Sequence, residues 1–283
     1  MPRNTQGRTA SAPKKTKAKT TPAPTKSVLD FVSPTEFVEL PSQGRFYAAD
    51  HPLHGQDTVE IRFMTAKDED ILTSQTLLRK GVALEKLLQN LLVDKTIKPS
   101  ELLSGDRSAI LVAARATAYG EVYETEVACP GCSVKADYGF NLREGTVNHG
   151  NDWGNLDITE TNNTTFLVTL PVTKVTAEIR LLTGADESTI TSAVQKNKRN
   201  SLLEKTLTSQ ISKFIVSLND DENRDIIYRF VDMMPAADSY HLRKAYRALN
   251  PTFDLTQHYE CSSCGHTQDM EVPITANFFW PNR

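Results

Sequence analysis

Two short stretches, Cys129-Pro130-Gly131-Cys132 and Cys261-Ser262-Ser263-Cys264, hold the four cysteines of the chain. A Cys-x-x-Cys pair offers two thiolates from one tight turn, and two such pairs complete the tetrahedral shell of a closed structural zinc site. The residues between the cysteines are small or turn-forming, as such a turn requires. The spacing therefore predicts a zinc-ribbon-like site that clips the middle of the chain to its end. Its ligands are expected to be Cys129, Cys132, Cys261 and Cys264.

Two other interpretations of the cysteines are a redox dithiol and free buried thiols. A redox pair is typical of a thioredoxin-like βαβ unit, and no such pattern surrounds either pair. His258 and His266 lie close to the second pair and could replace a sulfur ligand, although four cysteines already complete the shell. Because a closed shell leaves no position for a reactive water, the predicted role of the zinc is structural.

The segments that precede the two pairs recur in the same order. Val59-Glu60-Ile61-Arg62 with Asp68-Glu69 matches Ala177-Glu178-Ile179-Arg180 with Asp186-Glu187 at an offset of 118 residues. Leu84-Glu85-Lys86 is echoed by Leu203-Glu204-Lys205 at an offset of 119. Asp106 matches Asp238 at an offset of 132, and the same offset maps the first cysteine pair onto the second. The pattern indicates an ancient duplication, with about 14 extra residues in loops near 196–200 and 220–223 of the second copy.

The expected fold class is α+β, an internally duplicated strand–helix module whose two copies share the cysteine knuckles. Each copy begins with short alternating strands, such as 58–63, that lead into helices. The leucines at 84, 87, 88, 91 and 92 predict a buried helical stripe, and Asp106 is expected to cap a second helix that stops near Gly120. The predicted boundaries are a disordered basic arm at 1–29, a first repeat at 30–142, a linker at 143–165 and a second repeat at 166–283.

Composition limits the class of protein. The chain has 283 residues, of which 39% are hydrophobic and 24% charged, as in a soluble globular protein. No apolar run approaches the roughly 20 residues that a membrane span needs. The first residues lack the apolar stretch of a secretory signal, so we expect a reducing cytoplasm, where paired cysteines favour metal over disulfide.

Charge is divided unevenly along the chain. Residues 1–29 carry seven basic residues and no acid, which gives them a charge of +7. Because the whole chain has a net charge of −3, the residues after 29 carry a net charge of −10. The arm has almost no large apolar residue and is expected to be disordered in isolation. A cationic arm can bind nucleic acid, an acidic protein surface or its own acidic body. It has no aromatic residue to stack on bases, which favours a solubilising or partner-docking role.

Signatures of catalysis are not found. The chain has no phosphate-binding glycine loop, no Gly-x-Ser-x-Gly elbow and no His-Glu-x-x-His motif. The paired acids at 68–69 and 186–187 fit helix capping, and Arg62 and Arg180 are expected to pair with carboxylates. His51 and His54 lie beside acids in a polar segment that reads as an exposed loop. We therefore expect no catalytic residue, no cofactor-binding residue and no enzyme activity.

The C-terminal stretch Phe278-Phe279-Trp280 places three aromatic residues in a row. These residues can fold back over the cysteine knuckles or serve as anchors in a partner's pocket.

Several of these motifs together resemble the baseplate hub proteins of contractile-tailed, T-even-like bacteriophages. The resemblance covers roughly residues 36–281. It is carried by Leu40-Pro41-Ser42, Val59-Glu60-Ile61-Arg62, Asp68-Glu69-Asp70-Ile71-Leu72, Gly105-Asp106-Arg107, Cys129-Pro130-Gly131-Cys132, Leu182-Thr183-Gly184-Ala185-Asp186-Glu187 and Phe278-Phe279-Trp280-Pro281. It implies a structural or assembly role in the virion tail after assembly in the host cytoplasm. Other baseplate and tail-tube proteins are the implied partners, with no catalysis and with multiple copies in the particle.

A second class of function stays open at this point, namely a zinc-ribbon adaptor that binds nucleic acid through the basic arm. The acidic body argues against it, because nucleic-acid affinity depends on neutralising phosphates with basic residues. We therefore expect neither nucleic acid nor a membrane as the partner.

Overall fold

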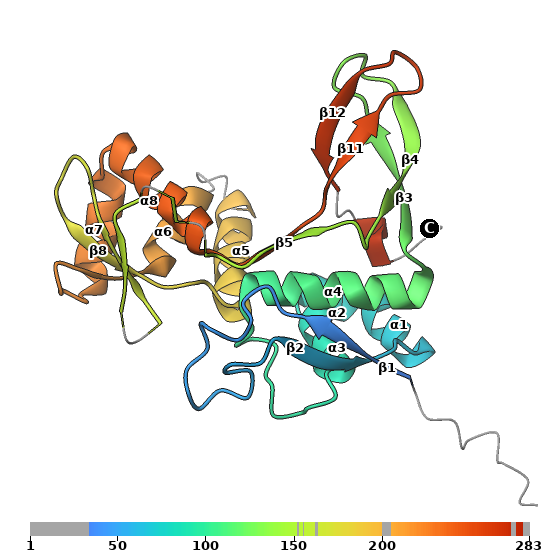
Figure 1. Ribbon diagram of the computed structural model, residues 1–283, viewed down its shortest axis with the longest axis horizontal. Coiled ribbons are helices and arrows are strands. Elements are labelled where there is room, and N and C mark those ends of the chain that lie inside the picture. Colours follow the sequence, from blue (N-terminus) through green and yellow to red (C-terminus); the bar gives the residue numbers. More distant parts are fainter. Residues whose placement is uncertain are drawn as a thin grey trace, which may run out of the picture. The chain divides into compact units, whose positions relative to one another are not determined.

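The computed structural model describes residues 34–151, 153–154, 156–161, 164–199, 205–272 and 276–279. The basic arm at 1–29 lies outside these residues. Helices and short antiparallel strands alternate along the chain (Figure 1), so the structure confirms the α+β class. In chain order, the first elements are β1 (Thr35–Glu39), β2 (Thr58–Arg62), α1 (Ala66–Thr73), α2 (Gln75–Lys80), α3 (Ala83–Leu91), α4 (Ser104–Tyr119), β3 (Val122–Ala128), β4 (Lys135–Asn141), β5 (Thr146–Asn148) and β6 (Ile158–Glu160).

The remaining elements are β7 (Phe166–Thr169), β8 (Thr176–Ile179), α5 (Gly184–Arg199), α6 (Thr206–Phe214), β9 (Ile215–Leu218), α7 (Arg224–Met233), α8 (Ala236–Leu249), β10 (Thr252–Asp254), β11 (Thr256–Glu260), β12 (Thr267–Glu271) and the 3₁₀ turn Ala276–Phe279. The strands form antiparallel pairs β1–β2, β3–β4, β5–β10 and β11–β12, together with a four-stranded sheet in the order β6-β7-β8-β9. The β5–β10 pair joins strands from distant parts of the sequence.

The helices follow the apolar pattern of the sequence. Leu87, Leu88, Leu91 and Leu92 are fully buried on α3 and just after it, as the leucine spacing predicts. Thr65 is the N-cap of α1 and forms a capping box with Asp68, in which each side chain accepts a hydrogen bond from the other residue's backbone amide. The long helix α4 ends at Tyr119, and Gly120 follows it as predicted. One continuous apolar cluster includes residues from both predicted repeats.

The segment 143–165, predicted to be a linker, contains the short strands β5 and β6. Leu203 and Glu204, which echo Leu84 and Glu85 in the sequence, lie outside the described residues. Two expectations about local structure were wrong. Lys196–Arg199 belong to helix α5 instead of a loop. Asp106 lies inside α4 and its carboxylate bonds to another segment, so it does not cap its own helix.

The polar segment at 41–57 is a series of turns, as expected, but it is not simply exposed. Phe46, Tyr47 and Leu53 are buried within it. The His51 ring stacks on Tyr47 with ring centroids 4.3 Å apart, and burial lowers the pKa of this histidine. His54 bonds through Nδ1 to the carbonyl oxygen of Tyr47 at 2.7 Å. The two histidines therefore help to fix the loop and do not gather around a common point.

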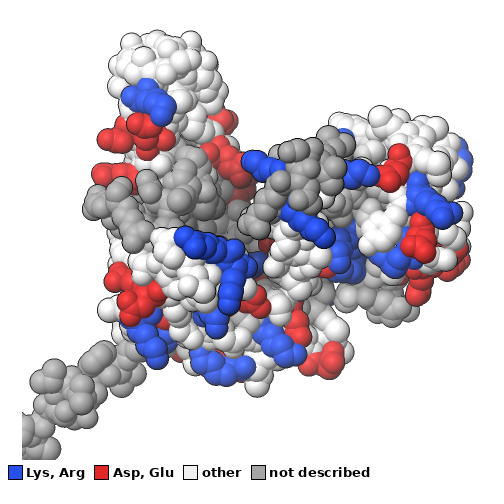
Figure 2. All heavy atoms as spheres, turned by 180° about the vertical axis from the view of Figure 1, so that it is seen from behind, with Lys and Arg blue, Asp and Glu red and all other residues white. Residues whose placement is uncertain are grey.

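Lys and Arg side chains are interspersed with Asp and Glu on the face shown in Figure 2. None of the described helices combines the length and the apolar character that crossing a membrane would require.

Candidate metal centre

Two β-hairpins present the four cysteines. Cys129 follows β3 and Cys261 follows β11, and each begins the turn that leads to the next strand. The two turns close with the same backbone bonds: Ser133 donates its amide to the Cys129 carbonyl, and Gly265 donates to the Cys261 carbonyl. Ser133 and Gly265 have left-handed φ angles of 60° and 69°. The two knuckles therefore share one backbone design, as the matching Cys-x-x-Cys spacing predicts.

The four cysteine sulfur atoms form a compact cluster. The Sγ atoms of Cys129 and Cys264 are 3.7 Å apart, and those of Cys132 and Cys261 are 3.9 Å apart. All four Sγ atoms lie within 4.8 Å of one another. Because Zn–S bonds are about 2.3 Å long, the sulfurs of a tetrahedral Cys₄ site are separated by about 3.8 Å. The spacing of the cluster thus fits a metal bound by four thiolates.

Electrostatics around the sulfurs favours a bound cation. The backbone amides of Ser263 and Cys264 hydrogen-bond to Cys261 and lower the pKa of its thiol to about 6. At Cys264 the amide of His266 acts in the same direction, but the neighbouring sulfurs of Cys132, Cys129 and Cys261 prevail and raise the pKa to about 12. Four sulfurs this close do not all ionise readily without a positive charge between them.

Side chains hold the two hairpins together beside the cluster. Gln257 pairs with the backbone of Asn141 through two bonds, in which its amide oxygen accepts at 3.0 Å and its amide nitrogen donates at 2.6 Å. Tyr138 donates to the carbonyl oxygen of His258 at 3.1 Å and packs edge-on against Tyr259, with centroids 5.0 Å apart. These contacts fix the positions of the two knuckles independently of the sulfurs.

The two nearby histidines are not part of the sulfur cluster. The His258 ring lies 3.5 Å from an oxygen of Asp269, on the exposed side of the hairpin. The His266 ring lies against Gly131, where an added Cβ would meet it at about 3.0 Å. Among the described residues, the grouping of potential metal ligands consists of the four cysteines alone.

Part of the aromatic C-terminal stretch packs close to the first hairpin. Phe278 and Phe279 are buried, and Phe278 meets Tyr123 of β3 edge-on with centroids 5.1 Å apart. Arg115 of α4 donates from Nε to the Phe278 carbonyl at 2.5 Å. The two phenylalanines therefore fold back onto the body, while Trp280 lies outside the described residues.

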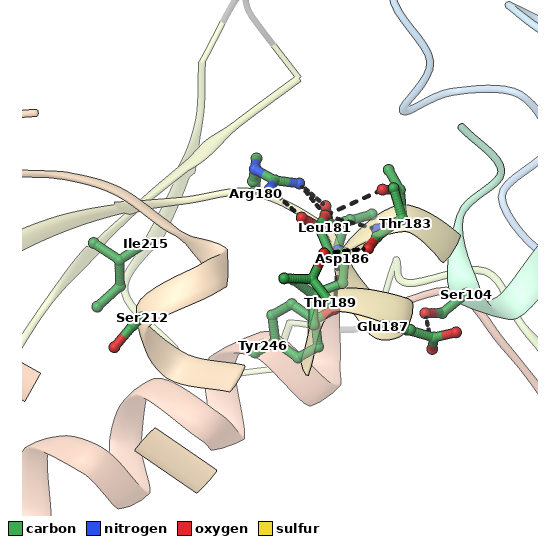
Figure 3. A network of polar contacts seen from close by, with 12 residues as sticks. Ser104, Arg180, Leu181, Thr183, Asp186, Glu187, Thr189, Ser212, Ile215 and Tyr246 are labelled. Atoms are coloured by element: carbon green, nitrogen blue, oxygen red, sulfur yellow. Dashed lines mark hydrogen bonds and ion pairs between the residues drawn. The ribbon is translucent and has the colours of Figure 1, made fainter. Parts of the chain in front are cut away.

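A polar network recurs where a strand meets a helix. In the first half, Arg62 donates to both oxygens of Asp68 at 2.7 and 2.9 Å, and the Thr65 amide and hydroxyl also donate to Asp68. In the second half, Arg180 donates to both oxygens of Asp186 at the same two distances, and Thr183 donates in the same manner. Figure 3 shows this second network at the start of α5. The arginines pair with carboxylates, as expected.

A second recurrence involves two buried carboxylates in the first turns of α4 and α8. Asp106 accepts hydrogen bonds from the Ser42 amide and hydroxyl and from the Tyr47 hydroxyl. Asp238 accepts from the amides of Val172 and Thr173 at 2.7 and 3.0 Å. Each carboxylate thus pins the turn that follows a Leu-Pro dipeptide, at 40–41 and at 170–171. The matched aspartates were visible in the sequence, but the turns that they bind were not.

A family model described as T4 bacteriophage base plate protein matches residues 34–280. No curated protein and no solved structure matches the chain.

Proposed function

The chain belongs to the family of T4 bacteriophage base plate proteins, and from this premise we propose that it is a zinc-stabilised docking protein of the baseplate hub in a contractile tail. The family places the protein in the tail of the virion and gives it a structural role in the baseplate. The match spans the whole described body, which is the observation that carries the proposal.

The zinc proposal rests on the sulfur cluster. Cys129, Cys132, Cys261 and Cys264 would supply the whole ligand shell, and a zinc ion held by four thiolates is closed to water and serves as a cross-link. Cys129 and Cys261 are buried, as expected for ligands at the inner side of a structural site. The bond would join two hairpins that are more than a hundred residues apart in sequence, so it would strongly restrict the unfolded chain.

We attribute the paired features of the body to an internal duplication, with the first repeat at 30–142, a connecting segment at 143–165 and the second repeat at 166–283. The matched Arg–Asp networks and the matched buried aspartates support it. The halves also meet closely, since the Gly184 amide donates to the Leu102 carbonyl at 2.9 Å. At Gly105, an added Cβ would lie 1.9 Å from the Pro251 carbonyl, so the contact requires glycine. Such a body is suited to act as a rigid docking block.

Other baseplate and tail-tube proteins are the proposed partners, and multiple copies in one particle would follow from tail symmetry. We propose no catalytic role and no nucleic-acid partner. The alternative of a nucleic-acid adaptor rests on the basic arm at 1–29, and no described feature favours it.

Quantitative mass spectrometry of purified particles tests the proposal. The expected result is the chain at a fixed copy number relative to known tail proteins, retained through density-gradient purification. Loss of the chain from mature particles would show a transient assembly factor instead of a hub component. Steep, salt-dependent DNA binding by the purified protein, with no association with tails, would favour the adaptor.

A further inference from the structure

Helix α8 presents three cations on its exposed side. Arg243, Lys244 and Arg247 are all exposed, and they lie within about one turn of the helix. Among the described residues, no carboxylate lies within ion-pair distance of any of them. By contrast, Arg62 and Arg180 each have a bidentate carboxylate partner. An unpaired basic cluster stands out on a body whose net charge is negative.

The cations line a hollow between α8 and the segment that precedes β6. This hollow measures about 590 Å³ and is also lined by Trp153, Leu156 and Tyr240. The Trp153 indole donates to the Gly150 carbonyl at 2.9 Å, which fixes its ring in the wall. Tyr240 is 64% exposed, although it is a large aromatic residue. Three cations, the exposed Tyr240 and the half-buried Trp153 are thus combined in one concave surface.

A second hollow of about 330 Å³ borders two of the three cations. Arg243 and Arg247 line both hollows, and Leu207 and Ile211 of α6 form apolar parts of the second. Asn250 also lines the second hollow, and its side-chain oxygen is buried with no hydrogen-bond partner in the described part of the chain. The two arginines therefore border two hollows that a ligand with apolar side chains could fill.

We propose that this α8 ridge (Arg243, Lys244 and Arg247 with Tyr240 and Trp153) docks an acidic segment of a neighbouring protein in the baseplate, an inference that rests on the proposed function. Arginine binds carboxylates bidentately, and aromatic residues beside arginine are typical anchors of protein interfaces. Nucleic acid fits less well. The three cations lie along about 6 Å of the α8 axis and can therefore contact only one or two phosphates. Affinity for nucleic acid depends on many phosphate contacts.

The test measures peptide binding to the full-length protein by fluorescence anisotropy. The probe is a labelled peptide of about 12 residues with alternating Glu and one Phe anchor. Replacing Arg243→Gln, Lys244→Gln and Arg247→Gln together should weaken its binding at least about tenfold, because three charge-assisted contacts are lost. The matched control is Lys67→Gln, Arg79→Gln and Lys80→Gln, which removes three exposed cations from α1 and α2 and should change binding less than about twofold.

A charge-reversal variant distinguishes the loss of the binding surface from a loss of folding. The Arg243→Glu, Lys244→Glu, Arg247→Glu protein should lose the acidic peptide and gain binding to a Lys-rich peptide of equal length. Equal weakening by the α8 and control triples would overturn the inference, because binding would then follow net charge or the arm. The inference would also be overturned if the three glutamine substitutions on α8 left peptide binding unchanged but abolished self-association or binding of a DNA oligonucleotide.

This outcome is separable from that of the proposed function. If the peptide result fails while the chain still occurs at fixed copy number in purified particles, only the α8 inference is lost. If the chain is absent from particles, the hub proposal fails whatever the peptide does.

Discussion

The two Arg–Asp networks have the same bonds but different surroundings. Asp68 is fully buried and accepts a further bond from Asn90 at 3.3 Å, whereas Asp186 is 7% exposed and has no such amide beside it among the described residues. Hydrogen bonds also lower the pKa of Asp68 to about 2, against the opposing effect of burial. In each half, the arginine and the aspartate of the pair are only six positions apart in the chain, so the bonds are the same in both halves. The surroundings differ because they depend on distant helices.

The helices beyond these networks show the same contrast. In the first half, the chain after the network forms two short helices, α1 and α2, separated at Ser74. In the second half the corresponding residues form one continuous helix, α5. Helix α7 follows β9 in the second half, whereas the first half has no helix between α3 and α4. The strand–turn–helix junction is therefore the same in both halves, whereas the helices around it differ.

The largest expected difference between the halves concerns these ion pairs. Asp68→Asn should destabilise the protein by about 3 kcal/mol, because the partly buried Arg62 loses its charged partner at a fully buried position. Asp186→Asn should cost about 2 kcal/mol, since its side chain is closer to solvent. Urea unfolding of both variants measures the two values. Equal costs would show that the local pair alone, and not its environment, sets the stability.

The buried aspartates of α4 and α8 should respond to pH in opposite directions. Burial raises the pKa of Asp106 in spite of its three hydrogen bonds, so its contribution to stability falls as pH rises through that raised pKa. The pKa of Asp238 is lowered, because the amides of Val172 and Thr173 outweigh burial. Its stabilising contribution is present above the ordinary Asp pKa of about 4 and is lost as pH falls below it.

The free energy of unfolding, measured from pH 3 to pH 7, distinguishes the effects of Asp106 and Asp238. Relative to the wild type, Asp238→Asn should be least destabilised at the acid end. Asp106→Asn should be most destabilised there, because the wild-type protein then gains from protonating Asp106. Parallel curves for the two variants would contradict the assignment.

The smallest expected difference lies in the cysteine knuckles. Ser133 and Gly265 occupy equivalent left-handed positions, and only glycine adopts that conformation without steric cost. Ser133→Gly should raise stability by about 0.5 kcal/mol, and Gly265→Ser should lower it by about 1 kcal/mol. Thermal unfolding of the metal-loaded protein measures both. A gain from Gly265→Ser would show that the two turns are not equivalent.

Local patterns in the sequence predicted much of this molecule. The leucine stripe and the pairing of Arg62 and Arg180 with carboxylates each depend on residues close in the chain, and the structure confirms them. The sulfur cluster joins distant parts of the chain, and it could be predicted because two Cys-x-x-Cys pairs together supply the four ligands of one metal site. The role of the metal and the duplication stay predictions.

Features that depend on distant contacts were missed. Strand β5 has three residues and is a strand because it pairs with β10, which lies about a hundred residues later. The composition of the segment does not reveal this pairing and predicted a linker. Asp106 looks like a helix cap because the pattern of the sequence does not reveal that Ser42 and Tyr47 lie against it. The α8 cations were not singled out, although their spacing within one helical turn was an available signal.

The structural zinc is tested most directly by metal content and thermal unfolding of the same full-length preparation. We expect one zinc ion per chain, and a fall in melting temperature when a strong chelator removes it, because the β3–β4 and β11–β12 hairpins then lose their common ligand. Cys129→Ser should reproduce the fall, whereas a serine substitution at half-buried Ala118 of α4, outside the cluster, should not. A chain that carries no zinc, or that melts at the same temperature after the metal is removed, would contradict a structural metal centre.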